Sequence, residues 1–347
     1  MTAGKTNNLI RRGNSLALRA APLILFAVIF LPAGPGAEAR GLRTYHGDPI
    51  PDEIEAMYAG GLNFLASSQT PSGCWSGSHG SEPGVTALAV LAFLAHGDDP
   101  DYGPYAGTVR KGLDFILSSA NDGNGYIGPS MYNHGFATLA LAEAYGMADD
   151  RRLGPALKKA VGLIITSQSQ NRNGGWRYSP ESHDADTTVS GAQMAALFAA
   201  RNAGIAVPDS SIKAGIKFYK RCQSGNGGFG YTGPGTSSPA RSAIGALVFA
   251  LAGKKDSPEF KSALLNLQQT RFESGSYAYY YAYYAAQAFF QGDMKRWNAW
   301  NKSLIERLKR SQDSDGAWNG NHGTVFSTSA ALLSLAVNYR FLPIYER

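Results

Sequence analysis

The feature that most constrains the fold of this chain is a glycine followed within two residues by an aromatic side chain, a pattern that occurs six times. The aromatic members follow one another at spacings of 51, 50, 53, 48 and 41 residues, and they are Trp75, Tyr126, Trp176, Phe229, Tyr277 and Trp318. A glutamine lies six to eight residues before four of them, at Gln69, Gln168, Gln223 and Gln312. Self-similarity with a period near fifty residues predicts a repeat architecture in which each repeat is one supersecondary unit.

Each repeat has two helical segments with different hydrophobic patterns. The segment before the glycine has one apolar stripe at helical spacing, such as Ile54, Tyr58, Leu62 and Leu65, which is typical of a helix with one solvated side. The segment after the glycine is apolar on most faces, which is typical of a buried helix. Segments of this second kind are 85–95, 136–145, 189–200, 243–252 and 329–337. The sequence predicts an all-α fold, an (α/α)6 toroid of six helical hairpins in two concentric rings; an open solenoid would share the pattern.

The N-terminus has the pattern of an export signal. A basic stretch ends at Arg19, an apolar run of 14 residues follows over 20–33, and Ala37-Glu38-Ala39 supplies a small-x-small cleavage site. The run is shorter than the ~20 residues of a helix that spans a bilayer. We expect a signal peptide over residues 1–39, a linker over 40–51 and one toroid domain over 52–347, with an uncleaved anchor as the alternative. The mature chain would lie in the periplasm, in the cell envelope or outside the cell, without an integral membrane segment.

Composition limits the function further. The 347 residues are 44% hydrophobic and 17% charged, which excludes extended disorder. The formal net charge is +6, but four of the 32 basic residues lie in the expected signal peptide, so a nucleic-acid partner is not expected. Cys74 and Cys222 are the two cysteines, too few for a disulfide framework, and the sequence leaves open whether they pair.

The turns that contain glutamine and tryptophan resemble a known motif. The segments 61–75, 160–176 and 304–318 resemble the QW motif of squalene–hopene and oxidosqualene cyclases. Over roughly residues 52–340, the chain is similar to the α/α-toroid superfamily of terpene cyclases and protein prenyltransferases, which carry prenyltransferase/squalene oxidase repeats. The resemblance implies a toroid in which each glutamine and aromatic side chain ties its turn to neighbouring helix ends.

Asp184 and Asp186 are the candidate catalytic residues. The run from His183 to Thr188 resembles the DxDD acid motif of the cyclases, in which the middle aspartate protonates an alkene or epoxide; Thr187 stands where the last aspartate would be. Two carboxylates two residues apart at a buried mouth would raise each other's pKa and keep one protonated. The alternative is structural: Asp186 or Thr187 caps the following helix and Asp184 is solvated.

The candidate ligand-binding residues lie near the expected starts of inner helices, and they are Tyr277, Tyr280, Tyr281, Tyr284, Arg241, His183 and His322. The four tyrosines share one face of a helix. If that face lines the cavity, its rings and hydroxyls suit polyisoprenoid, sterol-like or sugar ligands, whereas packing within the core is the alternative. Arg241 is expected either to bind an anionic head group or to remain a solvated charge at the rim.

No metal or cofactor is expected, because Cys74 and Cys222 lie away from the inner-helix starts at which a prenyltransferase-like zinc site would need a cysteine. Three functions remain. The preferred one is an exported toroid that binds, and through Asp186 transforms, an isoprenoid or other hydrophobic small molecule or lipid. The second is a non-catalytic scaffold whose partners are other envelope proteins. The third is a carbohydrate-active (α/α)6 enzyme with carboxylates such as Asp184, Asp186 and Glu181.

Overall fold

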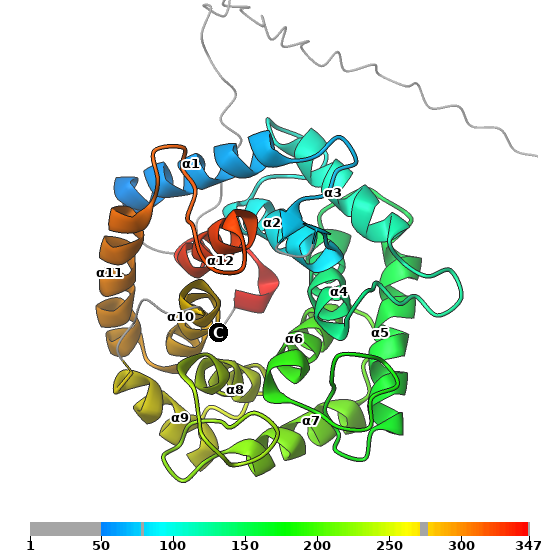
Figure 1. The fold of residues 1–347 in the computed structure, drawn as a ribbon, viewed down its shortest axis with the longest axis vertical. Helices are drawn as coiled ribbons and strands as arrows, with labels where there is room; N and C mark the ends of the chain where they lie inside the picture. Colours follow the sequence, from blue (N-terminus) through cyan, green and yellow to red (C-terminus); the bar gives the residue numbers. More distant parts are fainter. Residues whose placement is uncertain (1–49, 78–79, 271–276, 346–347) are drawn as a thin grey trace, which may run out of the picture. The chain divides into compact units, whose positions relative to one another are not determined.

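The computed structural model describes residues 50–77, 80–270 and 277–345. The chain divides into two units, residues 1–43 and 44–347, and all described residues belong to the second. Within them, six helices form the outer ring of Figure 1: α1 (Asp52–Ser68), α3 (Ala106–Ser118), α5 (Leu153–Gln170), α7 (Asp209–Cys222), α9 (Pro258–Gln268) and α11 (Met294–Ser311). Six helices alternate with these along the chain and form the inner ring: α2 (Pro83–His96), α4 (Met131–Tyr145), α6 (Thr187–Asn202), α8 (Pro239–Leu251), α10 (Ala278–Gly292) and α12 (Thr324–Ala336). The predicted all-α toroid of six hairpins is confirmed.

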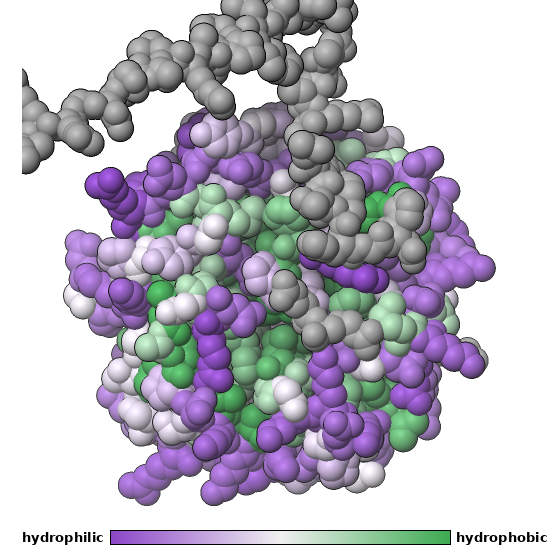
Figure 2. Space-filling view, turned by 180° about the vertical axis from the view of Figure 1, so that it is seen from behind, coloured by the Kyte–Doolittle hydropathy of each residue, from purple (hydrophilic) through white to green (hydrophobic). Residues whose placement is uncertain are grey.

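The two rings differ in burial as their hydrophobic patterns predict. Every residue of the inner helix α2 is buried, whereas the outer helix α7 buries one stripe that includes Ile212, Ile216 and Tyr219. The space-filling view shows the consequence on the face opposite to that of Figure 1, where hydrophobic residues gather towards the middle and hydrophilic residues towards the edge (Figure 2). The hydrophobic core therefore lies within the inner ring and between the two rings.

Glutamine side chains tie four of the glycine turns to the outer helix of the next repeat. Nε2 of Gln69 donates to the carbonyl of Gly73 in its own turn at 2.9 Å and to the carbonyl of Thr108 in α3 at 2.9 Å. Nε1 of Trp75 donates to the carbonyl of Leu65 at the end of α1, at 2.7 Å. The bond from Trp75 satisfies a carbonyl in the last turn of α1, which has no partner within the helix. Gln168, Gln223 and Gln312 make the same pair of bonds in their turns.

The bonds of Gln312 close the ring. Its Nε2 donates to the carbonyl of Gly316 in the sixth turn at 2.9 Å and to the carbonyl of Met57 in α1 at 2.8 Å. The sixth turn approaches α1 so closely that a Cβ on Gly316, whose φ is +86°, would lie 2.3 Å from the carbonyl oxygen of Gly60. Helix α12 also packs against α2. The last repeat therefore binds the first, and the open solenoid is excluded.

Some expectations change or stay untested. The structure adds a two-stranded antiparallel hairpin of β1 (Ser76–Gly77) and β2 (Gly80–Ser81), which the sequence did not predict. Cys74 and Cys222 are buried thiols, with no disulfide between them. Among the described helices, none is long and apolar enough to cross a membrane. The expected signal peptide over 1–39, most of the linker over 40–51 and the fifth turn around Gly275 lie outside the described residues.

Candidate functional site

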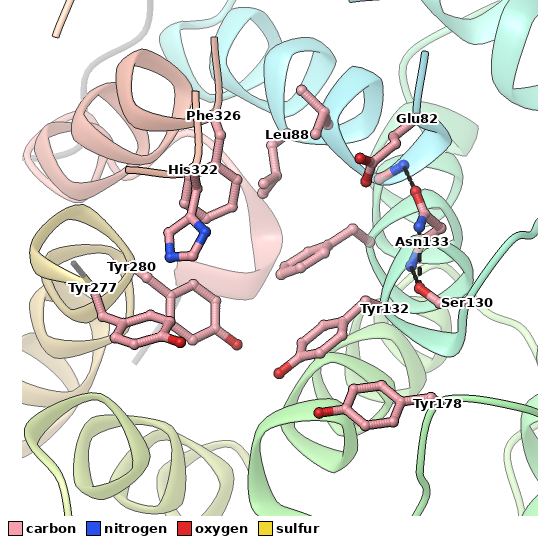
Figure 3. Close-up of a pocket in the computed structure, with 13 residues that line it drawn as sticks. Glu82, Leu88, Ser130, Tyr132, Asn133, Tyr178, Tyr277, Tyr280, His322 and Phe326 are labelled. Atoms are coloured by element: carbon pink, nitrogen blue, oxygen red, sulfur yellow. Dashed lines mark hydrogen bonds between the residues drawn. The ribbon is translucent and has the colours of Figure 1, made fainter. Parts of the chain in front are cut away.

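A cavity of about 430 Å³ lies where four inner helices begin. Each hairpin places the start of its inner helix directly after the glycine turn, so the first turns of α2, α4, α10 and α12 meet at one end of the inner ring (Figure 3). The loop before α6 adds Tyr178 to the wall. A concave space of this size at the mouth of a helical barrel is the usual form of a small-molecule site.

Aromatic rings form two facing walls of the cavity (Figure 3). On one wall, the ring of Tyr132 lies 6.4 Å from that of Phe136 and 6.2 Å from that of Tyr178. The hydroxyl of Tyr178 continues this wall outward through a hydrogen bond with the hydroxyl of Tyr231. The rings that belong to each wall are in contact with one another, so the walls are rigid surfaces and not isolated side chains.

The opposite wall comes from α10 and α12. The ring of His322 lies 5.0 Å from that of Tyr277 and 5.5 Å from that of Phe326, and Phe326 lies 6.2 Å from Tyr280. Tyr277 is 60% exposed and stands at the mouth, whereas Tyr280 is buried deeper, and burial raises the pKa of its hydroxyl. Leu88 and Val85 of α2 complete an apolar lining between the walls.

Asp186 is the N-cap of α6, as the structural alternative predicted. Its Oδ1 accepts hydrogen bonds from the amides of Thr188 and Val189, both at 2.8 Å, and from Oγ1 of Thr188 at 2.6 Å. Its Oδ2 lies 3.4 Å from Nε of Arg177. The side chain is fully buried and does not line the cavity. Burial raises the pKa of Asp186, while these hydrogen bonds and Arg177 oppose the rise.

Asp184 is solvated and does not join Asp186 at a buried mouth. It is 65% exposed, and its Oδ2 accepts a hydrogen bond from Arg177 at 2.7 Å. Because Asp184 lies in solvent and Asp186 is fully buried, the expected pair of carboxylates at a buried mouth is not formed. The physical reason is the bend before α6, which turns Asp184 to solvent while Asp186 folds back over the first turn of the helix.

Of the seven expected ligand-binding residues, Tyr277, Tyr280 and His322 line the cavity, and Tyr281, Tyr284, Arg241 and His183 do not. Tyr281 faces Trp300 of the outer helix α11, and burial raises its pKa to about 12. Tyr284 packs under the cavity, with its ring 5.0 Å from that of Tyr280. The four tyrosines therefore have different surroundings. The same side of the helix borders the cavity at Tyr277 and Tyr280, the core at Tyr284 and the outer ring at Tyr281.

Arg241 and His183 lie away from the cavity wall. The guanidinium of Arg241 donates to the carbonyl of Thr236 at 2.7 Å and lies 5.9 Å from the ring centre of Tyr231, beside a separate surface hollow. His183 is exposed in the loop before α6, where its carbonyl accepts a hydrogen bond from Asn173 at 3.1 Å.

Several lining residues were missed from the sequence, namely Glu82, Tyr132, Asn133, Phe136, Tyr178 and Phe326. Most of them occupy the residue before an inner helix or its first two turns, in the same repeat position as Tyr277 and Tyr280. Aligning the six repeats on their glycine turns would have located these positions. Tyr178 had no such signal, because it lies within a loop of irregular length.

A second buried ionisable group lies further along the inner ring. Glu143 of α4 is 5% exposed, and both of its carboxyl oxygens are buried. Burial raises its pKa to about 8, and the backbone of Ile344 opposes the rise. Ile344 belongs to the short helix η1 (Pro343–Tyr345), which contacts α6 and brings the C-terminal segment inside the ring (Figure 1). In the described part of the chain, no group of three His, Cys, Asp or Glu side chains is arranged to hold a metal ion.

Comparisons with known proteins support the fold. No protein-family model and no curated protein matches the sequence. Among solved structures, a variant of the type II terpene cyclase MstE from Scytonema, in complex with its substrate geranylgeranyl dihydroxybenzoate, is similar with a TM-score of 0.63 and 16% identity, over 84% of this chain and 98% of that one. An inactive variant of a family 76 α-1,6-mannanase from Salegentibacter, in complex with α-1,6-mannotriose, is similar with a TM-score of 0.65 and 9% identity, over 83% and 99%.

A family 76 glycoside hydrolase from a bovine strain of Bacteroides thetaiotaomicron has a TM-score of 0.59 at 9% identity, over 82% of this chain and 77% of that one. At these identities the comparisons show a shared all-α toroid, such as terpene cyclases have, and no more. The fold occurs in both a cyclase and glycoside hydrolases, so the function must be argued from the site.

Proposed function

We propose that this chain is an exported toroid that binds an isoprenoid or another hydrophobic small molecule in the cavity at the start of α2, α4, α10 and α12. The observation that carries the proposal is the pair of facing aromatic walls, joined by Leu88 and Val85, around a space of about 430 Å³. Apolar burial contributes roughly 25 cal/mol per Å² removed from water, so a ligand enclosed by these walls gains affinity without a specific polar contact. Support for export comes from the basic stretch, the apolar run and the small-x-small site of the N-terminus.

The site favours binding over acid-initiated cyclisation. A general acid must reach the atom that it protonates, within about 3 Å or through one water. Asp186 is fully buried outside the cavity wall, and three donors to its Oδ1 hold it at the start of α6. Its geometry is that of a helix cap, so the proposal assigns the cavity a binding role and no protonation step.

Carbohydrate hydrolysis has less support from the cavity. Glycoside hydrolases generally place two carboxyl groups about 5–10 Å apart across the bond that they cleave. Among the described residues that line the cavity, Glu82 is the single carboxylate, and Asp184 and Asp186 lie outside it. We retain one second function, a scaffold for other envelope proteins. It predicts an empty cavity, so the experiment below distinguishes it from ligand binding.

The test combines native mass spectrometry with a binding measurement. Full-length protein purified from its own envelope is analysed for a bound small molecule, which is then extracted and identified. Delipidated protein is titrated with geranylgeraniol, a neutral isoprenoid alcohol. Val85→Phe places a ring in the cavity and should weaken binding at least tenfold, whereas Leu265→Phe, on the exposed side of α9, should leave binding unchanged.

Equal binding by wild type and Val85→Phe would refute the cavity as the site. Protein that holds no small molecule and does not bind geranylgeraniol, but co-purifies with other envelope proteins, would refute ligand binding and support the scaffold. Circular dichroism of both variants confirms that a lost signal reflects the cavity and not unfolding.

A further inference from the structure

One carboxylate lies on the wall of the cavity among the residues that the structure describes. Glu82, the residue directly before α2, lines the cavity, and its carboxyl group is turned towards it (Figure 3). It forms no ion pair with any described residue, and its Oε1 has no hydrogen-bond partner. No lysine or arginine is among the described lining residues. Among the described lining residues, Glu82 therefore has no lysine or arginine as a counter-ion, and His322 lies on the opposite wall.

Two backbone amides close to Glu82 are already engaged by side chains. The amide of Gly84 in the first turn of α2 donates to Oδ1 of Asn133 at 2.8 Å. The amide of Asn133 in turn donates to Oγ of Ser130, the N-cap of α4, at 3.4 Å. Helix N-termini attract anions through free amides and the helix dipole, and the dipole effect fades within the first turn. Here the amide of Gly84 is already hydrogen-bonded to Asn133 and is not free to hold an anion.

Arg177 lies beside the wall, but it is paired outside the cavity. The guanidinium of Arg177 lies 5.1 Å from the ring centre of Tyr178, but Asp184 at 2.7 Å and Asp186 at 3.4 Å balance its charge. An anionic head group in the cavity would meet Glu82, and no lysine or arginine of the described lining is there to offset the repulsion. Such a buried like-charge pair is strongly unfavourable.

Aromatic faces and a lone carboxylate together suit a positively charged ligand. Six of the lining residues are aromatic rings, on both sides of the cavity: Tyr132, Phe136, Tyr178, Tyr277, Tyr280 and Phe326. The negative face of an aromatic ring attracts cations, and rings grouped around one space are the usual recognition device for alkylammonium groups. We infer that the hydrophobic ligand carries an organic cation, a protonated or quaternary amine, with Glu82 as its counter-ion. This inference rests on the proposed binding function and adds the chemical class of the ligand's head group.

Three ten-carbon probes that differ in head group test the inference by isothermal titration calorimetry. They are decyltrimethylammonium, kept below its micelle concentration, decan-1-ol and decanoate. Wild-type protein should bind the ammonium probe at least tenfold more tightly than decan-1-ol, and decanoate most weakly. Glu82→Gln should bring the ammonium probe and decan-1-ol to within about threefold of each other while decan-1-ol still binds. Glu306→Gln removes the same charge from the exposed side of α11 and should keep the wild-type order.

The outcomes separate this inference from the binding function. Equal or tighter binding of decan-1-ol or decanoate by wild type overturns the cationic head group and leaves the hydrophobic cavity standing. A preference for the ammonium probe that survives in Glu82→Gln overturns the role of Glu82. Loss of decan-1-ol binding in Glu82→Gln shows that the substitution has damaged the cavity. The order of the three affinities in the wild-type protein then decides whether the head group is cationic. If none of the probes binds to wild-type protein, the cationic head group is overturned, and the titration with geranylgeraniol decides the binding function.

Discussion

Replacement of Asp186 by alanine and by asparagine separates a helix cap from a catalytic acid. Alanine removes the oxygen that accepts from the amides of Thr188 and Val189, and it leaves both buried donors without a partner. A lost N-cap costs about 1–2 kcal/mol, and a buried unsatisfied donor adds a similar amount, so we expect Asp186→Ala to lower the free energy of unfolding by about 3 kcal/mol. Asparagine keeps an oxygen at the Oδ1 position and is a good cap, so Asp186→Asn should cost about 1 kcal/mol, mainly through Arg177.

Urea unfolding of the two variants at pH 7, followed by circular dichroism, gives the difference between these values. An alanine variant as stable as the asparagine variant would contradict the cap, because the two differ chiefly in that one oxygen. The extracted native ligand provides an independent readout: if protein turned it over and Asp186→Asn abolished turnover without a loss of stability, Asp186 would be an acid and our reasoning would be wrong.

Two further predictions concern the interior and the closure of the ring. Burial raises the pKa of Glu143 to about 8 from an ordinary value of 4.5, so the folded chain binds a proton that the unfolded chain releases. As the pH rises from about 5 to 8, the free energy of unfolding should therefore fall by about 1.4 kcal/mol per pH unit. Glu143→Gln should flatten this slope in urea titrations. An unchanged slope would show that the carboxyl is not buried. Gln312→Ala removes the bonds to Met57 and Gly316 and should lower the free energy of unfolding by about 2 kcal/mol. The matched variant Gln69→Ala, which removes the same pair of bonds in the first turn, should have a similar effect. A Gln312→Ala variant as stable as the wild type would mean that the ring is open.

The candidate site was only partly visible in the sequence. Tyr277 and Tyr280 could be placed because an apolar helix follows a glycine turn there, and such a helix must begin inside the ring. Tyr281 could not be separated from them, because helical spacing identifies a face and does not say which neighbour covers each part of it. Its contact with Trp300 depends on how far α11 reaches along α10, which is a property of packing between repeats.

Asp184 and Asp186 show the same limit for polar residues. Their spacing is compatible with a pair of carboxylates at a mouth and equally with a cap beside a solvated neighbour. The choice depends on backbone angles: Asp186 is extended, with φ −129° and ψ 158°, which is the conformation that turns an N-cap side chain over its own helix.

The sequence by itself determined the six hairpins, because the period of the glycine turns and the apolar pattern of each helix are local properties of the chain. It also identified the glutamines that tie each turn to its neighbours. Tertiary structure alone decided that Gln312 reaches Met57, that Glu82 faces a wall of rings, and that Glu143 is buried next to Ile344. These arrangements bring together residues of different repeats. Their energies depend on burial and on distances in three dimensions, and a local sequence pattern gives neither.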